Sequence, residues 1–172
     1  MKRVFLIGFM GAGKTTLGRE VSQRLSLPFF DLDERIVRDA GRSVSEIFRA
    51  EGEEGFRGRE ARALRALVDE PRGIIATGGG TFEAEENREI IRKTGVSIWL
   101  DVPTDVLLTR VTGRNRPLWR NEAAARDLAE RRKRSYRMAN IRLELGDDSA
   151  ENNVSKLEAL CVSLSTSIGR DS

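Results

Sequence analysis

Histidine is absent from this chain of 172 residues, and cysteine occurs only once. A histidine general base and a histidine-ligated metal are therefore both excluded. The single cysteine, Cys161, falls on the apolar side of a predicted C-terminal helix, so we expect a core position instead of a disulfide or a nucleophile. Any catalysis must depend on carboxylates, lysine and arginine.

Long hydrophobic runs are also missing, since no stretch approaches the roughly 20 apolar residues that a membrane span needs. The basic start followed by apolar residues resembles a signal peptide, but the apolar run breaks at Gly8. Linkers rich in proline or serine and internal repeats are absent too. We expect a single domain over residues 1–172, with no membrane segment, in the cytoplasm.

The charges are nearly balanced, with 30 lysine and arginine residues against 27 aspartate and glutamate residues. The densest basic run, residues 126–137, also contains acids and has the helical periodicity of a solvated face. Its one aromatic residue, Tyr136, does not make an aromatic-interleaved basic stripe, and no known binding motif accompanies the charge, so we expect no nucleic-acid partner. The slightly basic balance suits an enzyme with anionic substrates equally well.

Short apolar runs rich in β-forming residues alternate with segments of helical spacing, which predicts a parallel sheet covered by helices on both faces. The expected strands are 4–7, 29–31, 73–77, 96–100 and 141–145. The expected helices are 14–25, 34–40, a kinked pair over 45–69, 85–93, 104–112, 122–138 and 154–168. In a sheet of this kind ligands bind beyond the carboxyl ends of the strands, so we expect the functional site there.

A complete phosphate-loop motif, Gly8-Phe9-Met10-Gly11-Ala12-Gly13-Lys14-Thr15, follows the first predicted strand and opens the first helix. Its backbone N–H groups can surround a polyphosphate, with Lys14 as a point charge for the β and γ groups and Thr15 as a Mg²⁺ ligand. The motif therefore predicts nucleoside triphosphate binding. The residues expected to contact the nucleotide are Gly11, Ala12, Gly13, Lys14, Thr15 and Thr16.

Two carboxylates, Asp31 and Asp33, follow the second predicted strand. One of them could hold the hydration shell of Mg²⁺, and the other could accept a hydrogen bond from the hydroxyl of a second substrate. The alternative for either residue is simple capping of the following helix.

Arg57 and Glu60 lie one helical turn apart, which fits a surface ion pair or an arginine held ready for bidentate capture of a carboxylate. A buried strand then runs into Gly78, Gly79 and Gly80, whose backbone a ligand could approach closely. These features favour a small acceptor that carries both an anionic group and hydroxyls.

Residues 110–120 contain four arginines between two predicted helices, a composition typical of a mobile lid. We expect the lid over about residues 111–122. One of its arginines could stabilise the phosphoryl group during transfer. A solvated loop is the alternative.

Taken in order, these motifs resemble the shikimate kinase family over roughly residues 4–140. The resemblance is carried by Gly-x-x-Gly-x-Gly-Lys-Thr-Thr at 8–16, Asp-x-Asp at 31–33, Gly-Glu-x-x-Phe-Arg at 52–57, Gly-Gly-Gly at 78–80, Arg-Pro-Leu at 116–118 and Arg-x-x-x-Tyr at 132–136. It implies a monomeric three-layer P-loop kinase with a five-stranded parallel sheet and a helical substrate-binding segment over about 32–62. The implied reaction is ATP-dependent phosphorylation of the 3-hydroxyl of shikimate, in aromatic amino-acid biosynthesis.

The resemblance also implies how shikimate would be held. Arg57 and Arg132 would bind its carboxylate, and Asp33 would bind its hydroxyls and orient or deprotonate the attacking one. The backbone of Gly78, Gly79 and Gly80 would complete this pocket. Arg132 is preferred to the neighbouring Arg134 because of its spacing to Tyr136.

Further roles on the nucleotide side follow from the same resemblance. Lys14 and Arg116, with Asp33, would be the catalytic residues, and Arg116 would arrive with the lid. Arg110 would lie against the adenine of ATP. Thr15 would bind Mg²⁺ directly, and Asp31 would bind it through water.

Other functions remain possible at this level. A gluconate kinase or a nucleoside monophosphate kinase would share the phosphate loop, although the Gly-Glu-x-x-Phe-Arg and Arg-x-x-x-Tyr motifs argue against both. A catalytically silent shikimate-kinase-like binding protein would share the fold without the chemistry. The intact Lys14, Asp31, Asp33 and Arg116 argue against that alternative.

Overall fold

A parallel sheet lies at the centre of the computed structural model, which describes residues 2–111, 121–146 and 149–166. Its five strands are β1 Arg3–Ile7, β2 Phe29–Asp31, β3 Ile74–Ala76, β4 Gly95–Asp101 and β5 Ile141–Glu144. Their spatial order is β2-β3-β1-β4-β5, and every pairing between neighbours is parallel. The predicted parallel sheet is thus confirmed, with each strand within two residues of its expected bounds.

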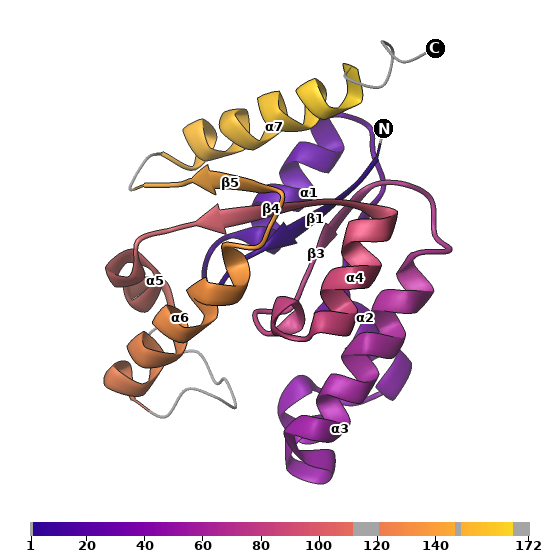
Figure 1. Ribbon diagram of the computed structural model, residues 1–172, viewed down its shortest axis with the longest axis vertical. Helices are drawn as coiled ribbons and strands as arrows, with labels where there is room; N and C mark the ends of the chain where they lie inside the picture. Colours follow the sequence, from indigo (N-terminus) through magenta and orange to yellow (C-terminus); the bar gives the residue numbers. More distant parts are fainter. Residues whose placement is uncertain (1, 112–120, 147–148, 167–172) are drawn as a thin grey trace.

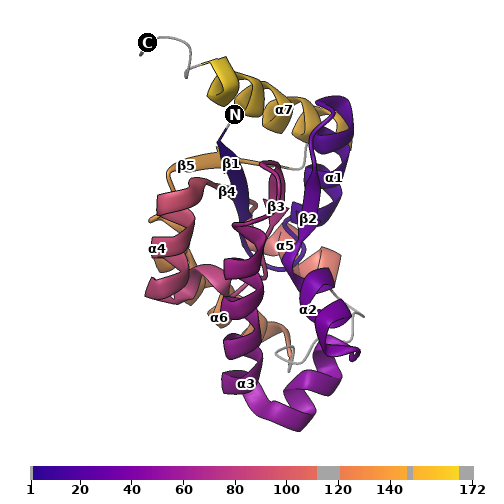
Figure 2. The same cartoon turned by 90° about the vertical axis from the view of Figure 1, so that its right-hand side faces the viewer.

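Helices cover both faces of the sheet and give the expected three layers (Figure 1). Figure 2 shows α1 Lys14–Arg24 and α7 Ala150–Thr166 together on one face and α4 Glu85–Thr94 on the other. Two helix pairs project beyond the sheet, and Figure 1 shows them on opposite sides. They are α2 Leu32–Ala40 with α3 Val44–Leu67, and α5 Thr104–Val111 with α6 Glu122–Tyr136.

Two helices begin earlier than their apolar spacing predicts, because polar side chains cap them. The Asp31 carboxylate accepts hydrogen bonds from the backbone N–H groups of Asp33 and Glu34, so α2 begins at Leu32. The Ser149 hydroxyl accepts the N–H of Asn152, and α7 therefore begins four residues before its expected start. In both cases the cap satisfies donors that a helix end leaves without partners.

Helix α3 is broken at Gly52, as the predicted kinked pair required. Gly52 has φ 70° and ψ −173°, a backbone conformation that favours glycine. A capping box between Ser43 and Glu46 begins the first half of the helix. Phe48 and Phe56 then pack across the break with ring centroids 4.6 Å apart. The kink therefore redirects the second half of α3, which carries the predicted arginine.

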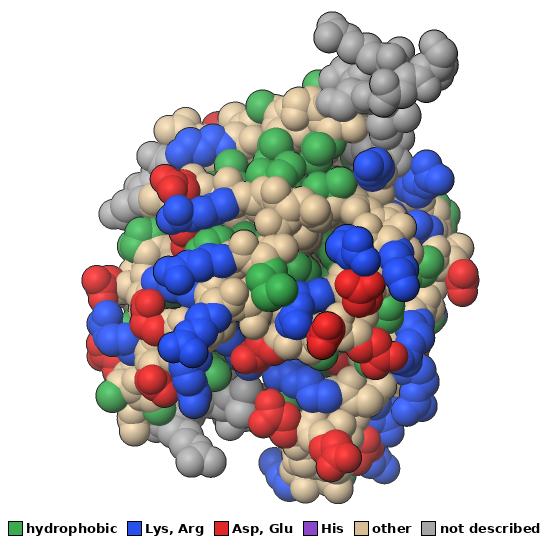
Figure 3. Space-filling model, viewed as in Figure 1, with side chains coloured by type: hydrophobic (Ala, Val, Ile, Leu, Met, Phe, Trp, Pro, Cys, Tyr) green, Lys and Arg blue, Asp and Glu red, His purple; other side chains and the backbone are tan. Residues whose placement is uncertain are grey.

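The apolar core lies on both sides of β1, whose residues from Val4 to Ile7 are fully buried. On the outside, Figure 3 shows basic and acidic side chains interspersed over the face in view. Such mixing is typical of a solvated surface. Within the described ranges, no helix combines the length and the apolar character needed to cross a membrane.

Cys161 lies in the core as expected, with no exposed surface. Burial raises the pKa of its thiol to about 11, and the nearby Glu158 carboxylate adds to this shift. We therefore predict that a thiol reagent at pH 8 modifies the folded protein at least about 100-fold more slowly than the guanidinium-unfolded protein. A small free thiol measured under both conditions controls for the reagent. Equal rates in the folded and unfolded protein would show that Cys161 is accessible.

Candidate active site

The phosphate loop is built around backbone turns that place α1 directly behind it. Gly8, Gly11 and Gly13 all have positive φ, at 149°, 80° and 90°. The Lys14 ammonium donates hydrogen bonds to the carbonyl oxygens of Gly8 at 2.8 Å and Phe9 at 2.9 Å. The loop therefore holds its lysine at the N-terminus of a helix, where N–H groups and the helix dipole favour an anion.

Thr15 and Asp31 meet at the base of this loop. The Thr15 hydroxyl donates a hydrogen bond of 2.6 Å to Asp31 Oδ2, while Asp31 Oδ1 caps α2. Asp31 therefore serves as the helix cap that one expectation named and also faces the proposed metal ligand. Both oxygens are hard ligands of the kind that Mg²⁺ takes, so the pair fits that ion.

A Mg²⁺ ion at this place would need ligands from outside the protein. Among the described residues there is no group of three histidine, cysteine, aspartate or glutamate side chains that could hold a metal. Mg²⁺ usually keeps several waters and binds one or two protein groups together with substrate phosphates. The Thr15 and Asp31 pair is consistent with such a site.

The phosphate loop borders a cavity of about 540 Å³ at the carboxyl edge of the sheet. The six residues from Gly11 to Thr16 that were expected to contact the nucleotide all line it. Arg110 lines the same cavity, and its Nη1 lies 3.4 Å from the Gly11 carbonyl oxygen. The lining also includes Leu145, directly after β5, and Ala150 and Asn153 of α7. The cavity is therefore open to a ligand that reaches from the loop to α7.

A second hollow adjoins the first and shares Met10, Asp33 and Gly79 with it. Its polar lining consists of the residues expected to hold the acceptor, and its apolar wall comes from α3. The remaining lining residues are Val44, Phe48, Phe56, Arg57, Glu60, Gly78, Gly80 and Arg132. The Asp33 carboxylate thus lies where the two hollows meet.

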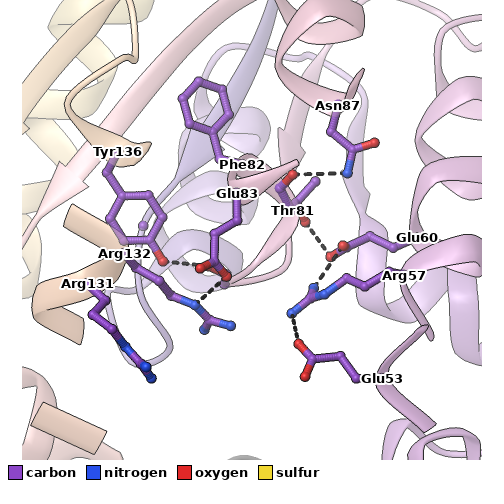
Figure 4. A network of polar contacts seen from close by, with 12 residues as sticks. Glu53, Arg57, Glu60, Thr81, Phe82, Glu83, Asn87, Arg131, Arg132 and Tyr136 are labelled. Atoms are coloured by element: carbon purple, nitrogen blue, oxygen red, sulfur yellow. Dashed lines mark hydrogen bonds and ion pairs between the residues drawn. The ribbon is translucent and has the colours of Figure 1, made fainter. Parts of the chain in front are cut away.

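Arg57 is held by two carboxylates of its own helix (Figure 4). Its Nη1 donates to Glu60 Oε2 at 2.9 Å, and its Nη2 approaches Glu53 Oε1 at 3.3 Å. Burial alone would lower the pKa of Arg57, but the attraction of Glu60 and Glu53 outweighs it and raises this pKa. Glu60 is fully buried and also accepts a 2.6 Å hydrogen bond from the Thr81 hydroxyl. The ion pair is therefore part of an internal network and not a surface pair.

Arg132 enters the same hollow from α6. Its side chain is 3% exposed, whereas Arg134 lies on the exposed side of the helix. The Arg132 Nε donates to Glu83 Oε2 at 2.7 Å. The spacing to Tyr136 had favoured Arg132 over Arg134, and the structure places Arg132 and not Arg134 in the pocket.

Tyr136 is buried one turn beyond Arg132, and its hydroxyl donates to the Gly79 carbonyl oxygen. Burial raises the pKa of Tyr136, so this hydroxyl stays protonated as a donor at neutral pH. Trp99 of β4 packs against its ring with centroids 6.0 Å apart. Tyr136 therefore ties the glycine loop to α6.

The three glycines after β3 leave room for protein side chains as well as for a ligand. A Cβ atom at Gly80 would lie 2.2 Å from Arg57 Nη2, and one at Gly78 would lie 2.7 Å from Glu60 Oε1. A Cβ atom at Gly79 would lie 3.3 Å from Arg132 Nη1. The arginines and their carboxylate partner therefore already require a bare backbone here.

The motifs did not reveal Thr81 and Glu83, although both contact the network in Figure 4. They lie in a 3₁₀ turn, Thr81–Glu83, directly after the glycines. The available signal was an acid close to the carboxyl end of a central strand. Arg116 and most of the expected lid lie outside the described residues, so what the sequence predicts for them stays a prediction.

Comparison with known proteins decides the family. A family model described as shikimate kinase matches residues 10–161. The chain belongs to the shikimate kinase family. A shikimate kinase of Caulobacter vibrioides is 42% identical to it over 150 residues, which cover 85% of this chain and 75% of that protein.

Solved structures agree with this assignment. The family member from Acinetobacter baumannii, solved in complex with shikimate, has a TM-score of 0.89 and 36% identity, and the match covers 95% of this chain and 94% of that one. A gluconokinase from Sinorhizobium meliloti matches with a TM-score of 0.66 but only 14% identity, over 97% of this chain and 95% of that one. The likeness to the gluconokinase shows the shared fold alone, and the alternative of a gluconate kinase is not supported.

We predict that Gly80→Ala weakens shikimate binding without unfolding the protein. Gly80 has φ −105°, which alanine adopts easily, and the three atoms nearest to the added methyl group all belong to the Arg57 guanidinium. Displacing one charged hydrogen-bonding group costs about 1.5–3 kcal/mol, which corresponds to a rise of roughly 10- to 150-fold in KM for shikimate. Steady-state kinetics measure this change, and KM for ATP should stay within about twofold.

The matched control is Gly58→Ala in the same helix as Arg57. Apart from the adjoining backbone of its own helix and its chain neighbours, nothing lies within 4 Å of a Cβ built at Gly58, so alanine there should leave KM for shikimate unchanged and stabilise α3 slightly. An unchanged KM in Gly80→Ala would mean that the position of Arg57 does not matter for shikimate.

Proposed function

We propose that this chain transfers the γ-phosphoryl group of ATP to the 3-hydroxyl of shikimate, giving shikimate 3-phosphate and ADP. One observation carries the proposal. The hollow that contains the guanidinium groups of Arg57 and Arg132 joins the phosphate-loop cavity at Asp33. An acceptor whose carboxylate meets the arginines can therefore present a hydroxyl to the terminal phosphate.

On the donor side, the loop N–H groups and Lys14 bind the phosphates of ATP. Phosphoryl transfer spreads negative charge over the equatorial oxygens, so fixed positive groups at this place lower the barrier. Thr15 and Asp31 would hold Mg²⁺, which when bound neutralises part of the phosphate charge. Arg110 lies at the nucleotide cavity and is proposed to contact the adenine. Arg116 remains a predicted phosphate ligand.

On the acceptor side, Arg57 and Arg132 hold the carboxylate, and the apolar wall of Phe48 and Phe56 packs against the ring of shikimate. Asp33 accepts a hydrogen bond from the 3-hydroxyl and turns its oxygen toward the γ-phosphorus. Holding two reactants in this geometry can contribute several kcal/mol to catalysis without any covalent step by the protein. Positioning and charge therefore account for the proposed chemistry.

The location, oligomeric state and domain extent of the protein stay predictions. We infer a cytoplasmic location, where ATP is available, a monomeric state and a single domain over residues 1–172. Light scattering on the purified protein measures the mass directly, for comparison with 19.3 kDa for one chain.

The direct test of the function is an assay of ADP release from Mg-ATP. Shikimate, quinate, gluconate and nucleoside monophosphates are offered separately at equal concentrations. We expect turnover that strongly favours shikimate. Turnover of another acceptor would keep the nucleotide site and overturn the acceptor site, and no turnover with any of them would favour a silent binding protein.

We predict that Arg132→Ala lowers shikimate affinity by about 2–5 kcal/mol, because it leaves the carboxylate without the buried one of its two guanidinium partners. The affinity for ATP should change little. Arg134→Ala is the matched control, since it removes the same charge from the exposed side of the same helix. Titration calorimetry with shikimate compares the two variants. Similar losses in both would mean that general charge, and not contact, governs binding.

A further inference from the structure

Glu83 contacts Arg132, the arginine that enters the acceptor pocket from α6. Its Oε2 lies 2.7 Å from Arg132 Nε, and the two residues are 49 positions apart in the sequence. The Glu83 side chain is 40% exposed, whereas Arg132 is 3% exposed. A partly hydrated carboxylate at the rim therefore holds a buried guanidinium from its Nε end.

The contacts of Arg132 indicate which edge of its guanidinium faces the acceptor pocket. Nε–H is taken by Glu83, and the group lies over the Phe9 ring at 5.8 Å. Nη1 lies beside Gly79, 3.3 Å from where a Cβ atom would stand. Figure 4 shows the outer end of the Arg132 guanidinium and that of Arg57 turned toward each other. The edge formed by Nη1 and Nη2 therefore faces the pocket. This edge can bind a carboxylate through two parallel hydrogen bonds, that is, in a bidentate manner.

The other arginine of the pocket also has a carboxylate partner, although at a different atom. Glu60 accepts a hydrogen bond of 2.9 Å from Arg57 Nη1, whereas Glu83 accepts one from Arg132 Nε. Arginine forks are effective for carboxylates only when their planes are fixed, because a free side chain loses several rotamers on binding. Each arginine of the pocket therefore has a carboxylate that fixes its plane.

We propose that Glu83 is a positioning residue for the acceptor: it orients Arg132 through Nε so that the Nη1–Nη2 edge meets the carboxylate of shikimate. This inference rests on the proposed function, in which Arg132 binds that carboxylate. Glu83 itself touches neither substrate.

Charge and positioning predict opposite signs for the loss of Glu83. A negative charge next to the pocket repels an anionic acceptor, so its removal would tighten binding if charge alone mattered. The 40% exposure of Glu83 places water around it, which screens this repulsion. The loss of a fixed guanidinium plane is not screened, and we expect it to dominate. The sign of the change in KM therefore distinguishes the two effects.

The experiment compares three variants of the full chain by steady-state kinetics. Glu83→Ala removes the acceptor oxygen and the charge, whereas Glu83→Gln keeps an oxygen that can accept the Arg132 Nε–H. Glu85→Ala is the control: Glu85 is an exposed acid in the first turn of α4, and the described residues show no ion pair to it. It removes the same charge two positions away. Thermal unfolding of each variant is measured in parallel.

We expect Glu83→Ala to raise KM for shikimate about fivefold, with KM for ATP within about twofold and little change in the unfolding temperature. Glu83→Gln and Glu85→Ala should stay within about twofold of the unmodified protein for both substrates. The proposal is overturned if Glu83→Ala leaves KM for shikimate unchanged or lowers it. It is also overturned if KM for ATP rises equally, or if Glu83→Gln is as impaired as Glu83→Ala.

A shikimate ester separates this inference from the function on which it rests. With the methyl ester of shikimate, which lacks the anionic group, Glu83→Ala should change kcat/KM less than it does with shikimate itself. Arg132→Ala is run in the same assay. If Arg132→Ala does not affect shikimate, the proposed acceptor site is wrong. If Arg132→Ala does and Glu83→Ala does not, only the role of Glu83 is wrong.

Discussion

The acceptor pocket depends on the hydrogen bonds that the buried carboxylate of Glu60 accepts. Glu60 has no exposed surface, and it accepts hydrogen bonds from the Arg57 guanidinium and the Thr81 hydroxyl. Burying a charge is costly unless such partners compensate it, so the three side chains must be placed together. The contact joins α3 to the turn after β3, and its closeness to Gly78 explains why that turn begins with a residue lacking a side chain.

The strand order brings the two halves of the site together. Because β3 lies between β2 and β1, the carboxyl ends of three neighbouring strands deliver Asp31, the glycine loop and the phosphate loop to one edge of the sheet. The helix pair α2–α3 and the helix α6 then add an arginine from each side. The nucleotide and acceptor hollows share Asp33 as a result. Phosphoryl transfer needs this adjacency more than it needs any unusual group.

The sequence sufficed for most features that depend on local spacing, but it missed two helix caps and the contacts between distant segments. The five strands, the kinked helix pair within 45–69 and the phosphate loop follow from hydrophobic period and glycine placement, and the structure confirms them, with the break at Gly52. The predicted starts of α2 and α7 were wrong because a single polar cap, and not apolar spacing, determines where each helix begins. Glu83 could not be found, since its partner lies 49 residues away and only the packing of α6 against the turn brings them together. The assigned roles of the site residues stay predictions.

A crystal structure of this chain with shikimate and Mg-ADP is the most direct test of the central claim, which is that two arginines fix the acceptor carboxylate while Asp33 meets the hydroxyl. We expect the carboxylate within hydrogen-bonding distance of the Nη atoms of both Arg57 and Arg132. We also expect the 3-hydroxyl next to Asp33, facing the phosphate loop. A carboxylate bound to only one arginine, or turned toward Lys14, would show that the two arginines do not fix the acceptor together.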